Sequence, residues 1–523
     1  MKQKFIPLFL VVFIFFGFHF QSNPGRDIVP SRTKQDIWVD SVLTQMSLNE
    51  KVGQLMWVRA YSNKGSAHEN KVAQLIQKYD IGGLTFFQGT PEKQAELTNR
   101  FQKMSKIPLI ISMDAEWGLG MRLKKSTISF PNALTLGAIQ DNRLIYKMGT
   151  EIARQLKRMG VHVNFAPVAD VNNNANNPVI NYRSFGEDRY NVAAKSYQYM
   201  QALQDHGVLA CAKHFPGHGD TDVDSHYDLP VITHNRQRLD SIELFPFQIL
   251  MEQDVASIMV GHLHIPALDS TPNFPMTLSR KIVTDLVQNE MNYDGLIITD
   301  GLGMKGVTKH YGSGEVEAMA LAAGNDICLL PQDVGDAFEK IKAYIITGKI
   351  DQNAIDRSVK KVLRHKYQLG LTHTQKIENK NIRRDLNTPD ALAVKRELFQ
   401  NALTIVRAKD GLIPLSNLDK YSMASLALGT LEDNVFQTYL QKYRTMPTWN
   451  LDKRITDYTR KQLLKDIRNY QRVIISLHNM NQSPSDNFGL TEDMIQTVNE
   501  LAKQTEVILV IMGNPYALKH FDE

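Results

Sequence analysis

Residues 208–219 read VLACAKHFPGHG. The run Val208–Ala212 is short and apolar, which is the pattern of a strand buried on both faces of a parallel sheet. Two polar residues, Lys213 and His214, follow it directly, and the prolines and glycines after them break regular structure. The sequence therefore predicts a buried strand that delivers polar side chains into a loop.

The same pattern recurs along the chain. Apolar runs of this kind lie at Leu55–Val58, Gly83–Phe87, Pro108–Met113, Val161–Val168, Val208–Ala212, Ala256–Val260, Gly295–Ile298 and Ile327–Leu330. Segments with a 3.6-residue period alternate with them. Eight rounds of strand and helix predict an α/β protein with a (β/α)8 TIM-type barrel, although an open doubly wound sheet shares this alternation.

The chain is long enough for a second domain after the barrel. Residues 372–390 are polar and charged, so we interpret them as a linker between a barrel over 23–371 and a smaller α/β domain over 391–523. Three β-type runs mark that smaller domain, at Met423–Leu428, Val473–Leu477 and Val507–Met512. So few strands make a weak sheet, and we expect this domain to be incomplete or to need a partner.

The N-terminus has the layout of a secretory signal. Lys2 and Lys4 precede the apolar stretch Phe5–Phe18, which is shorter than the roughly 20 residues that a membrane-spanning helix needs. We predict a signal peptide over 1–22 and an exported protein, periplasmic or extracellular. Retention by an uncleaved N-terminal segment is the alternative, and no other integral membrane span is expected.

Composition excludes several other classes of protein. Hydrophobic residues make up 43% and charged residues 22%, which is typical of globular proteins. The net charge is +5, and no block of like charges marks a nucleic-acid-binding arm, so no nucleic-acid partner is expected. Cys211 and Cys328 both lie in apolar runs, which predicts buried free thiols and excludes a disulfide framework.

Polar residues follow several of the predicted strands. In a parallel barrel the carboxyl ends of the strands surround one open cup. We therefore expect a single pocket lined by Asp114, Asp170, the Asn181–Arg183 loop, Lys213, His214, His262 and Asp300. For each of them taken alone, capping the next helix or facing water is the alternative.

The densest polar cluster, KHFPGHGDTDVDSH, occupies residues 213–226. Histidine and carboxylate are ligands for zinc or manganese, but the proline and glycines in this loop prevent a helix with ligands at i and i+4. We therefore expect neither a catalytic metal nor a cofactor. Proton transfer is the other hypothesis, because the Asp224 carboxylate can orient the His226 ring and raise its basicity.

This string, with ITDGLGM at 298–304 and NYRSFGED at 181–188, closely resembles glycoside hydrolase family 3, in particular its β-N-acetylglucosaminidase branch. The resemblance runs from about Val42 to the C-terminal end. It implies a (β/α)8 domain followed by an α/β sandwich domain. In that family the sandwich domain continues further than it does in this chain.

The resemblance also implies roles for particular residues. Asp300 would be the nucleophile, and the pair Asp224–His226 would be the acid/base. Binding of the terminal sugar would involve Asp114, Arg183, Lys213, His214, Asn164 and His262. The implied activity is that of a retaining exo-β-N-acetylglucosaminidase acting on peptidoglycan fragments or related glycans through a covalent glycosyl-aspartate.

Alternatives remain open at this point. A histidine acid is neutral after it donates its proton, so an incoming phosphate meets less repulsion than it would from a carboxylate, which makes phosphorolysis the runner-up. A β-glucosidase-type enzyme of the same family and a non-enzymatic carbohydrate-binding protein are two more. The sequence also departs from the family pattern at Trp117, where glycine is more frequent, and at Gly301, where many relatives carry an acid.

Overall fold

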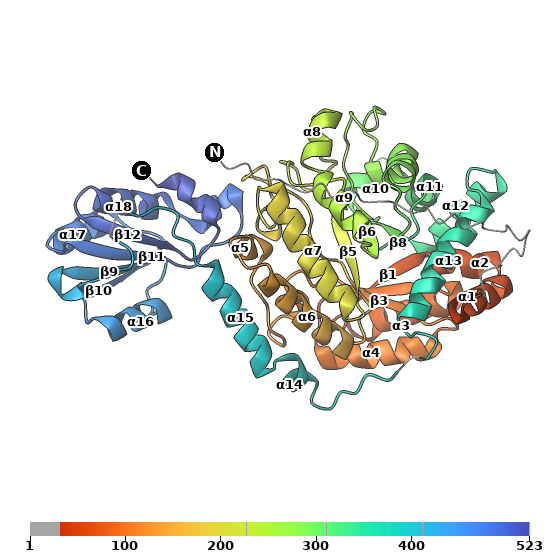
Figure 1. The fold of residues 1–523 in the computed structure, drawn as a ribbon, viewed down its shortest axis with the longest axis horizontal. Coiled ribbons are helices and arrows are strands. Elements are labelled where there is room, and N and C mark those ends of the chain that lie inside the picture. The colour runs from red at the N-terminus through yellow and green to blue at the C-terminus, as the bar shows by residue number, and fades with distance from the viewer. Residues whose placement is uncertain (1–31, 226, 310, 374, 410–411, 522–523) are drawn as a thin grey trace, which may run out of the picture.

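The computed structural model describes residues 32–225, 227–309, 311–373, 375–409 and 412–521. Within them, an eight-stranded and a four-stranded parallel sheet lie in separate parts of the molecule along its long axis (Figure 1). None of the described helices combines the length and the apolar content that a lipid bilayer crossing requires. The predicted signal peptide lies outside the described residues.

The eight-stranded sheet forms a barrel. Its strands are β1 Met56–Ala60, β2 Gly83–Phe86, β3 Ile110–Met113, β4 Val163–Asn164, β5 Leu209–Phe215, β6 Ser257–Val260, β7 Leu296–Thr299 and β8 Cys328–Leu329. They pair in parallel in the order β7-β6-β5-β4-β3-β2-β1-β8, and a parallel bridge between Ile298 and Ile327 joins the two end strands. The predicted (β/α)8 barrel is therefore confirmed.

Helices surround this barrel. They are α1 Lys34–Gln45, α2 Leu48–Gln54, α3 Gly65–Tyr79, α4 Pro91–Met104, α5 Ala133–Gly137, α6 Arg143–Arg158, α7 Arg189–Asp205, α8 Arg236–Ser241, α9 Phe245–Glu252, the π-helix η4 Lys281–Glu290, α10 Lys305–Thr308, α11 Glu315–Ala323, α12 Val334–Ile346 and α13 Gln352–Gln368. Side-chain caps begin several of them. Thr90, for example, accepts a hydrogen bond from Lys93 N and is followed by Pro91, a favourable first helical residue.

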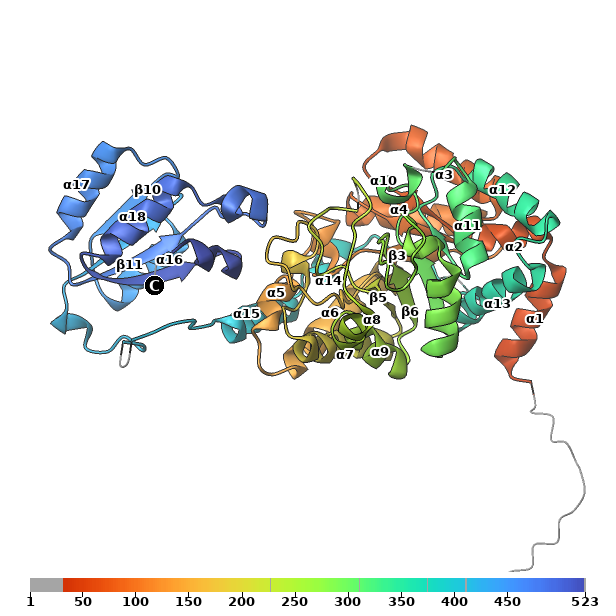
Figure 2. The same cartoon turned by 90° about the horizontal axis from the view of Figure 1, so that it is seen from above.

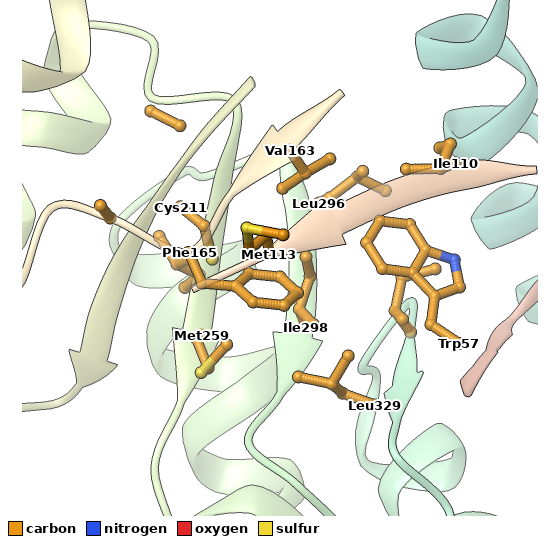
Figure 3. Close-up of a cluster of buried hydrophobic side chains, with 14 of the residues drawn as sticks. Trp57, Ile110, Met113, Val163, Phe165, Cys211, Met259, Leu296, Ile298 and Leu329 are labelled. Atoms are coloured by element: carbon orange, nitrogen blue, oxygen red, sulfur yellow. The ribbon is translucent and has the colours of Figure 1, made fainter. Parts of the chain in front are cut away.

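Apolar side chains fill the barrel interior below the strand ends. Trp57, Phe165 and Met259 are fully or almost fully buried there, among branched residues of neighbouring strands (Figure 3). Cys211 and Cys328 are buried free thiols, as the apolar runs predict. This packing closes the barrel from below, so that polar side chains gather at its carboxyl end.

The segment predicted as a linker packs on the barrel. It contains α14 Ile382–Leu386 and leads into α15 Pro389–Ala402, and both helices lie along α6 in Figures 1 and 2. Leu386 and Leu398 are buried in the barrel's hydrophobic core. The extended stretch 403–409 after α15 then leads toward the second sheet.

The second sheet is a layered α/β unit. Its strands β9 Met423–Leu428, β10 Thr448–Leu451, β11 Arg472–Leu477 and β12 Glu506–Ile511 pair in the order β10-β9-β11-β12. Helices α17 Asp457–Ile467 and α18 Glu492–Ala502 pack on one face, and α16 Val435–Tyr443 on the other. This agrees with the expected α/β sandwich. Strand β10 was not predicted, because its residues are exposed or half-buried and form no apolar run.

Candidate active site

A pocket of about 470 Å³ opens at the carboxyl ends of the barrel strands. Each strand, or the residue directly after it, contributes to the lining: in strand order Arg59, Thr85, Asp114, Phe165, Lys213, Met259, Asp300 and Leu329. The volume is typical of a small-molecule site. Barrel closure thus brings residues that are far apart in sequence around one cavity.

The structure places most of the predicted site residues in this pocket. Its lining includes Asp114, Arg183, Lys213, His214, Asp224 and Asp300. His226 lies outside the described residues. Asn164 and His262 are fully buried and lie behind the wall.

Ion pairs hold one side of the pocket. Lys213 Nζ lies 2.8 Å from Asp114 Oδ1 and 2.8 Å from Glu116 Oε1. Arg183 donates two hydrogen bonds to Glu116, of 2.7 and 3.0 Å, and Arg122 donates to Asp114. Paired and buried charges of this kind have fixed positions, so they present fixed donors and acceptors to a ligand.

Local charges set the ionisation of this group. Burial alone would raise the pKa of Asp114, but Lys213 and Arg122 outweigh it and hold that pKa well below its ordinary value. Burial opposes ionisation of Glu116 too, yet Arg183 and Lys213 lower its pKa to about 2. The pKa of Lys213 is raised, because the two carboxylates outweigh its burial. All these groups are therefore charged at neutral pH.

A buried carboxylate orients His214. Asp170 Oδ2 lies 2.8 Å from His214 Nδ1, and Asp170 Oδ1 accepts a 2.7 Å hydrogen bond from His218 N. The pairing of β5 with β6 shifts register between Lys213 and Phe215. Neighbouring residues of a regular strand point to opposite faces, and this irregularity allows both Lys213 and His214 to reach the pocket.

Asp300 follows β7 and faces the pocket. Its Oδ1 accepts a 2.7 Å hydrogen bond from Gly301 N, and its own N donates to Val260 O. His262 lies behind this turn, with Nε2 3.1 Å from Gly301 O and Nδ1 2.7 Å from Thr277 Oγ1. His262 is absent from the pocket lining and supports the Asp300–Gly301 turn through Gly301 O, so its role in sugar binding stays a prediction.

Asn164, which the resemblance implies in sugar binding, is likewise absent from the pocket lining. Its Nδ2 donates to Ala115 O and to Tyr199 Oη, and its Oδ1 accepts from Ala115 N. The amide is thus used inside the wall and fixes the backbone directly after Asp114. A residue on the last position of a short strand can point into the wall instead of the cup.

Asp224 reaches the pocket from the loop after β5. The buried His218 supports that loop, with Nδ1 2.8 Å from Thr221 Oγ1 and Nε2 3.2 Å from Ser225 Oγ. Burial, with a further contribution from His214, lowers the pKa of His218 to about 4. A neutral His218 therefore holds this loop at neutral pH.

One group of described residues is close enough to hold a metal ion. Asp220, His234 and Glu243 offer ligand atoms within 4.8 Å of one another, but they are absent from the pocket lining. Asp220 Oδ2 lies 2.6 Å from His234 Nε2, and Glu243 accepts hydrogen bonds of 2.8 and 2.9 Å from Arg238. These protein contacts join Asp220 to His234 across the loop after β5 and pair Glu243 with Arg238.

Two aromatic residues stand at the rim. Trp117 and Tyr182 both line the pocket, and their ring centroids lie 6.1 Å apart at an angle of 49°. Trp117 is half-buried. Aromatic faces in such a place suit stacking on a sugar ring.

Sequence reasoning missed the roles of Glu116, Arg122 and His218. Glu116 lies two residues beyond Asp114. A rule that selects the first polar residue after each strand selects Asp114 and not Glu116. His218 belongs to the dense polar cluster, but no pattern in that cluster indicates that its ring contacts Thr221 and Ser225. Arg122 lies eight residues beyond its partner Asp114, and no local pattern marks it.

Fold and site together define a parallel (β/α)8 barrel protein with an ionic pocket at its carboxyl end, the place where barrel enzymes carry their active sites. Residues 47–365 match the glycosyl hydrolase family 3 N-terminal domain. The chain belongs to glycosyl hydrolase family 3, which confirms the resemblance seen in its motifs.

Several relatives of the chain carry similar names. It is 33% identical over 377 residues to β-hexosaminidase A of Pseudoalteromonas piscicida, covering 66% of this chain and 62% of that protein. It is 31% identical over 335 residues to β-hexosaminidase LpqI of Mycobacterium tuberculosis, covering 61% and 82%. The structure of a glycoside hydrolase family 3 β-N-acetylglucosaminidase from Paenibacillus sp. str. FPU-7 matches with a TM-score of 0.76 and 28% identity, covering 91% and 92%. The chain thus spans about three fifths of the length of β-hexosaminidase A.

Proposed function

We propose that the protein is a retaining exo-β-N-acetylglucosaminidase that hydrolyses terminal β-linked N-acetylglucosamine. The observation that carries this proposal is the presence of two carboxylates, Asp300 and Asp224, in one pocket that also holds a fixed array of charges. The β-hexosaminidases among the relatives support it.

Asp300 is the nucleophile in this proposal. Cleavage of a glycosidic bond passes through an oxocarbenium-like state, which a carboxylate below the anomeric carbon stabilises and can trap as a glycosyl ester. The hydrogen bond from Gly301 N orients the Asp300 carboxylate at the end of β7. A strand end anchored by the sheet suits a group that must stay within bonding distance of one atom.

Asp224 and His226 supply the proton in this proposal. The proposal assigns His226 the role of proton donor to the departing oxygen through one ring nitrogen, with the Asp224 carboxylate as the expected acceptor for the other. In the second half of the reaction the same ring removes a proton from the attacking water.

The ionic side of the pocket binds the sugar. Lys213 and Arg183 donate to hydroxyl oxygens, and Asp114 accepts from hydroxyl groups. Because these side chains are already held by one another, little conformational entropy is lost when the sugar binds.

The natural substrate is proposed to be a peptidoglycan fragment encountered after export. Export rests on the N-terminal pattern of Lys2, Lys4 and the apolar stretch after them. The rim residues Trp117 and Tyr182 offer aromatic faces for the next sugar or for an attached peptide.

Product analysis on a muropeptide mixture, with and without phosphate, tests this function. We expect free N-acetylglucosamine under both conditions. Formation of N-acetylglucosamine 1-phosphate in the presence of phosphate would show that the protein is a phosphorylase and not a hydrolase. Binding of N-acetylglucosamine without any turnover would contradict an enzymatic role and favour a carbohydrate-binding protein.

A further inference from the structure

The second domain touches the barrel close to the pocket. Asn514 Nδ2 donates a 2.5 Å hydrogen bond to Asn181 Oδ1 across 333 positions of sequence. Asn514 follows β12, and both views show the last, dark blue part of the chain turned toward the barrel (Figures 1 and 2). Asn514 and Asn181 are 2% and 1% exposed, so water competes little for this bond.

Asn181 is coupled to Arg183 through the backbone. It begins the single 3₁₀ turn η2 Asn181–Arg183, and Ser184 N donates to its carbonyl oxygen. Its φ of +35° is in the left-handed region, which asparagine tolerates better than most residues. Its Nδ2 donates to Ala175 O, so the side-chain amide is bonded on both sides. A shift of Asn181 would therefore move the turn that carries Arg183.

The amide of Asn514 is equally committed. Its Oδ1 accepts from Tyr516 N at the start of the 3₁₀ helix η7 Pro515–His520, while its Nδ2 bonds Asn181. Without the Asn514 amide, the buried Oδ1 of Asn181 would lose this donor. A buried acceptor without its hydrogen bond destabilises the contact between the two segments.

Two more hydrogen bonds join the same pair of segments. Asn172 Nδ2 donates to Tyr516 Oη at 3.0 Å, and Lys519 Nζ donates to Asn176 Oδ1 at 3.1 Å. Both asparagines belong to the loop between β4 and Arg183. The second domain therefore contacts this loop through three hydrogen bonds. Of these, the Asn514–Asn181 bond lies nearest in sequence to Arg183.

We propose that Asn514 is a positioning residue for the proposed glycosidase, through which the second domain fixes Arg183 against Glu116 and so sets the affinity for the terminal sugar. Asn514 acts through Asn181 and does not touch the substrate. This inference rests on the proposed function, because it concerns the sugar that Arg183 binds.

The test is Asn514→Ala in the full chain. Arg183 contacts the sugar before and during bond cleavage, so we expect KM for p-nitrophenyl β-N-acetylglucosaminide to rise about fivefold, with kcat changed by less than about twofold. The inhibition constant of free N-acetylglucosamine should rise in step with KM. Tyr516→Phe, which removes one hydroxyl, should give a smaller rise.

The matched control is Asn434→Ala. Asn434 caps α16 in the same domain and bonds Gln437 of that helix, so this variant weakens the second domain without removing a contact to the loop. A purely structural role for Asn514 predicts the same kinetics for both variants. Unchanged KM in Asn514→Ala, or equal rises in both variants, would overturn the proposal.

Two further readouts keep the test decisive. If Asn514→Ala shows no cooperative melting, Tyr516→Phe takes its place, and an unchanged KM there contradicts the proposal. If the unaltered protein releases no p-nitrophenol, the proposed function fails instead, and calorimetric binding of N-acetylglucosamine to the same variants still measures whether Asn514 sets sugar affinity.

Discussion

The two sides of the pocket are built differently. On the strand side, the buried residues Glu116 and Lys213 and the half-buried Asp114 are ion-pair partners fixed to the barrel. On the loop side, Asp224 stands on a segment held by the uncharged hydrogen bonds of His218. In the proposed mechanism the strand side supplies sugar affinity and the nucleophile, and the loop side supplies proton transfer.

The largest effect should come from Asp300 on the strand side. Asp300→Asn removes the proposed nucleophile while keeping the shape of the side chain, and we expect kcat for p-nitrophenyl β-N-acetylglucosaminide to fall at least about 10⁴-fold. Affinity for N-acetylglucosamine should change little, which calorimetry checks. Substantial residual turnover by Asp300→Asn would show that another residue is the nucleophile.

Asp224→Asn should instead show a dependence on the leaving group. We expect kcat/KM for chitobiose to fall about 10³-fold, but that for the p-nitrophenyl substrate to fall only about tenfold, because p-nitrophenol leaves without much protonation. Asp222→Asn, at an exposed position of the same loop, is the control and should be nearly silent. An equal loss of kcat/KM on both substrates would show that Asp224 takes no part in protonating the leaving group.

Glu116→Gln breaks the ionic array. It leaves the buried Lys213 and the half-buried Arg183 with less opposing charge, so the free energy of unfolding should fall by about 3 kcal/mol in urea denaturation. Glu92→Gln is the matched control, because the pair of Glu92 with Arg383 is exposed and should contribute less than about 1 kcal/mol. Similar losses in the two variants would contradict the strand side as a buried array.

The last effect, on the loop side, appears only below neutral pH. The pKa of His218 is about 4 in the folded protein, against about 6.5 for an ordinary histidine. The folded state resists protonation, so this stabilisation is complete above pH 6.5 and is lost as the pH falls toward 4, by about 3 kcal/mol at most.

His218→Asn should remove that contribution. The difference in unfolding free energy between parent and variant should therefore shrink between pH 6.5 and pH 4, as measured by urea denaturation at each pH. Other buried histidines titrate in both proteins and cancel. A difference that stays constant over this range would show that His218 is not held neutral.

Sequence predicts the strand side better than the loop side. The rule that strand ends meet in one cup is geometric, so it correctly brings Asp114, Lys213 and Asp300 together. It cannot tell whether a side chain turns into the cup or into the wall. Asp170, which the rule places in the pocket, is fully buried and absent from the lining. Contacts such as Asn514–Asn181 join segments so distant in sequence that no local pattern encodes them.

Trapping of the covalent intermediate tests the central claim most directly. The protein would be incubated with a 5-fluoro-N-acetylglucosaminyl fluoride, digested, and mapped by mass spectrometry. The account predicts one added sugar unit on the peptide that carries Asp300, and none in Asp300→Asn. A label on another residue, or turnover with inversion at the anomeric carbon and no label, would contradict it.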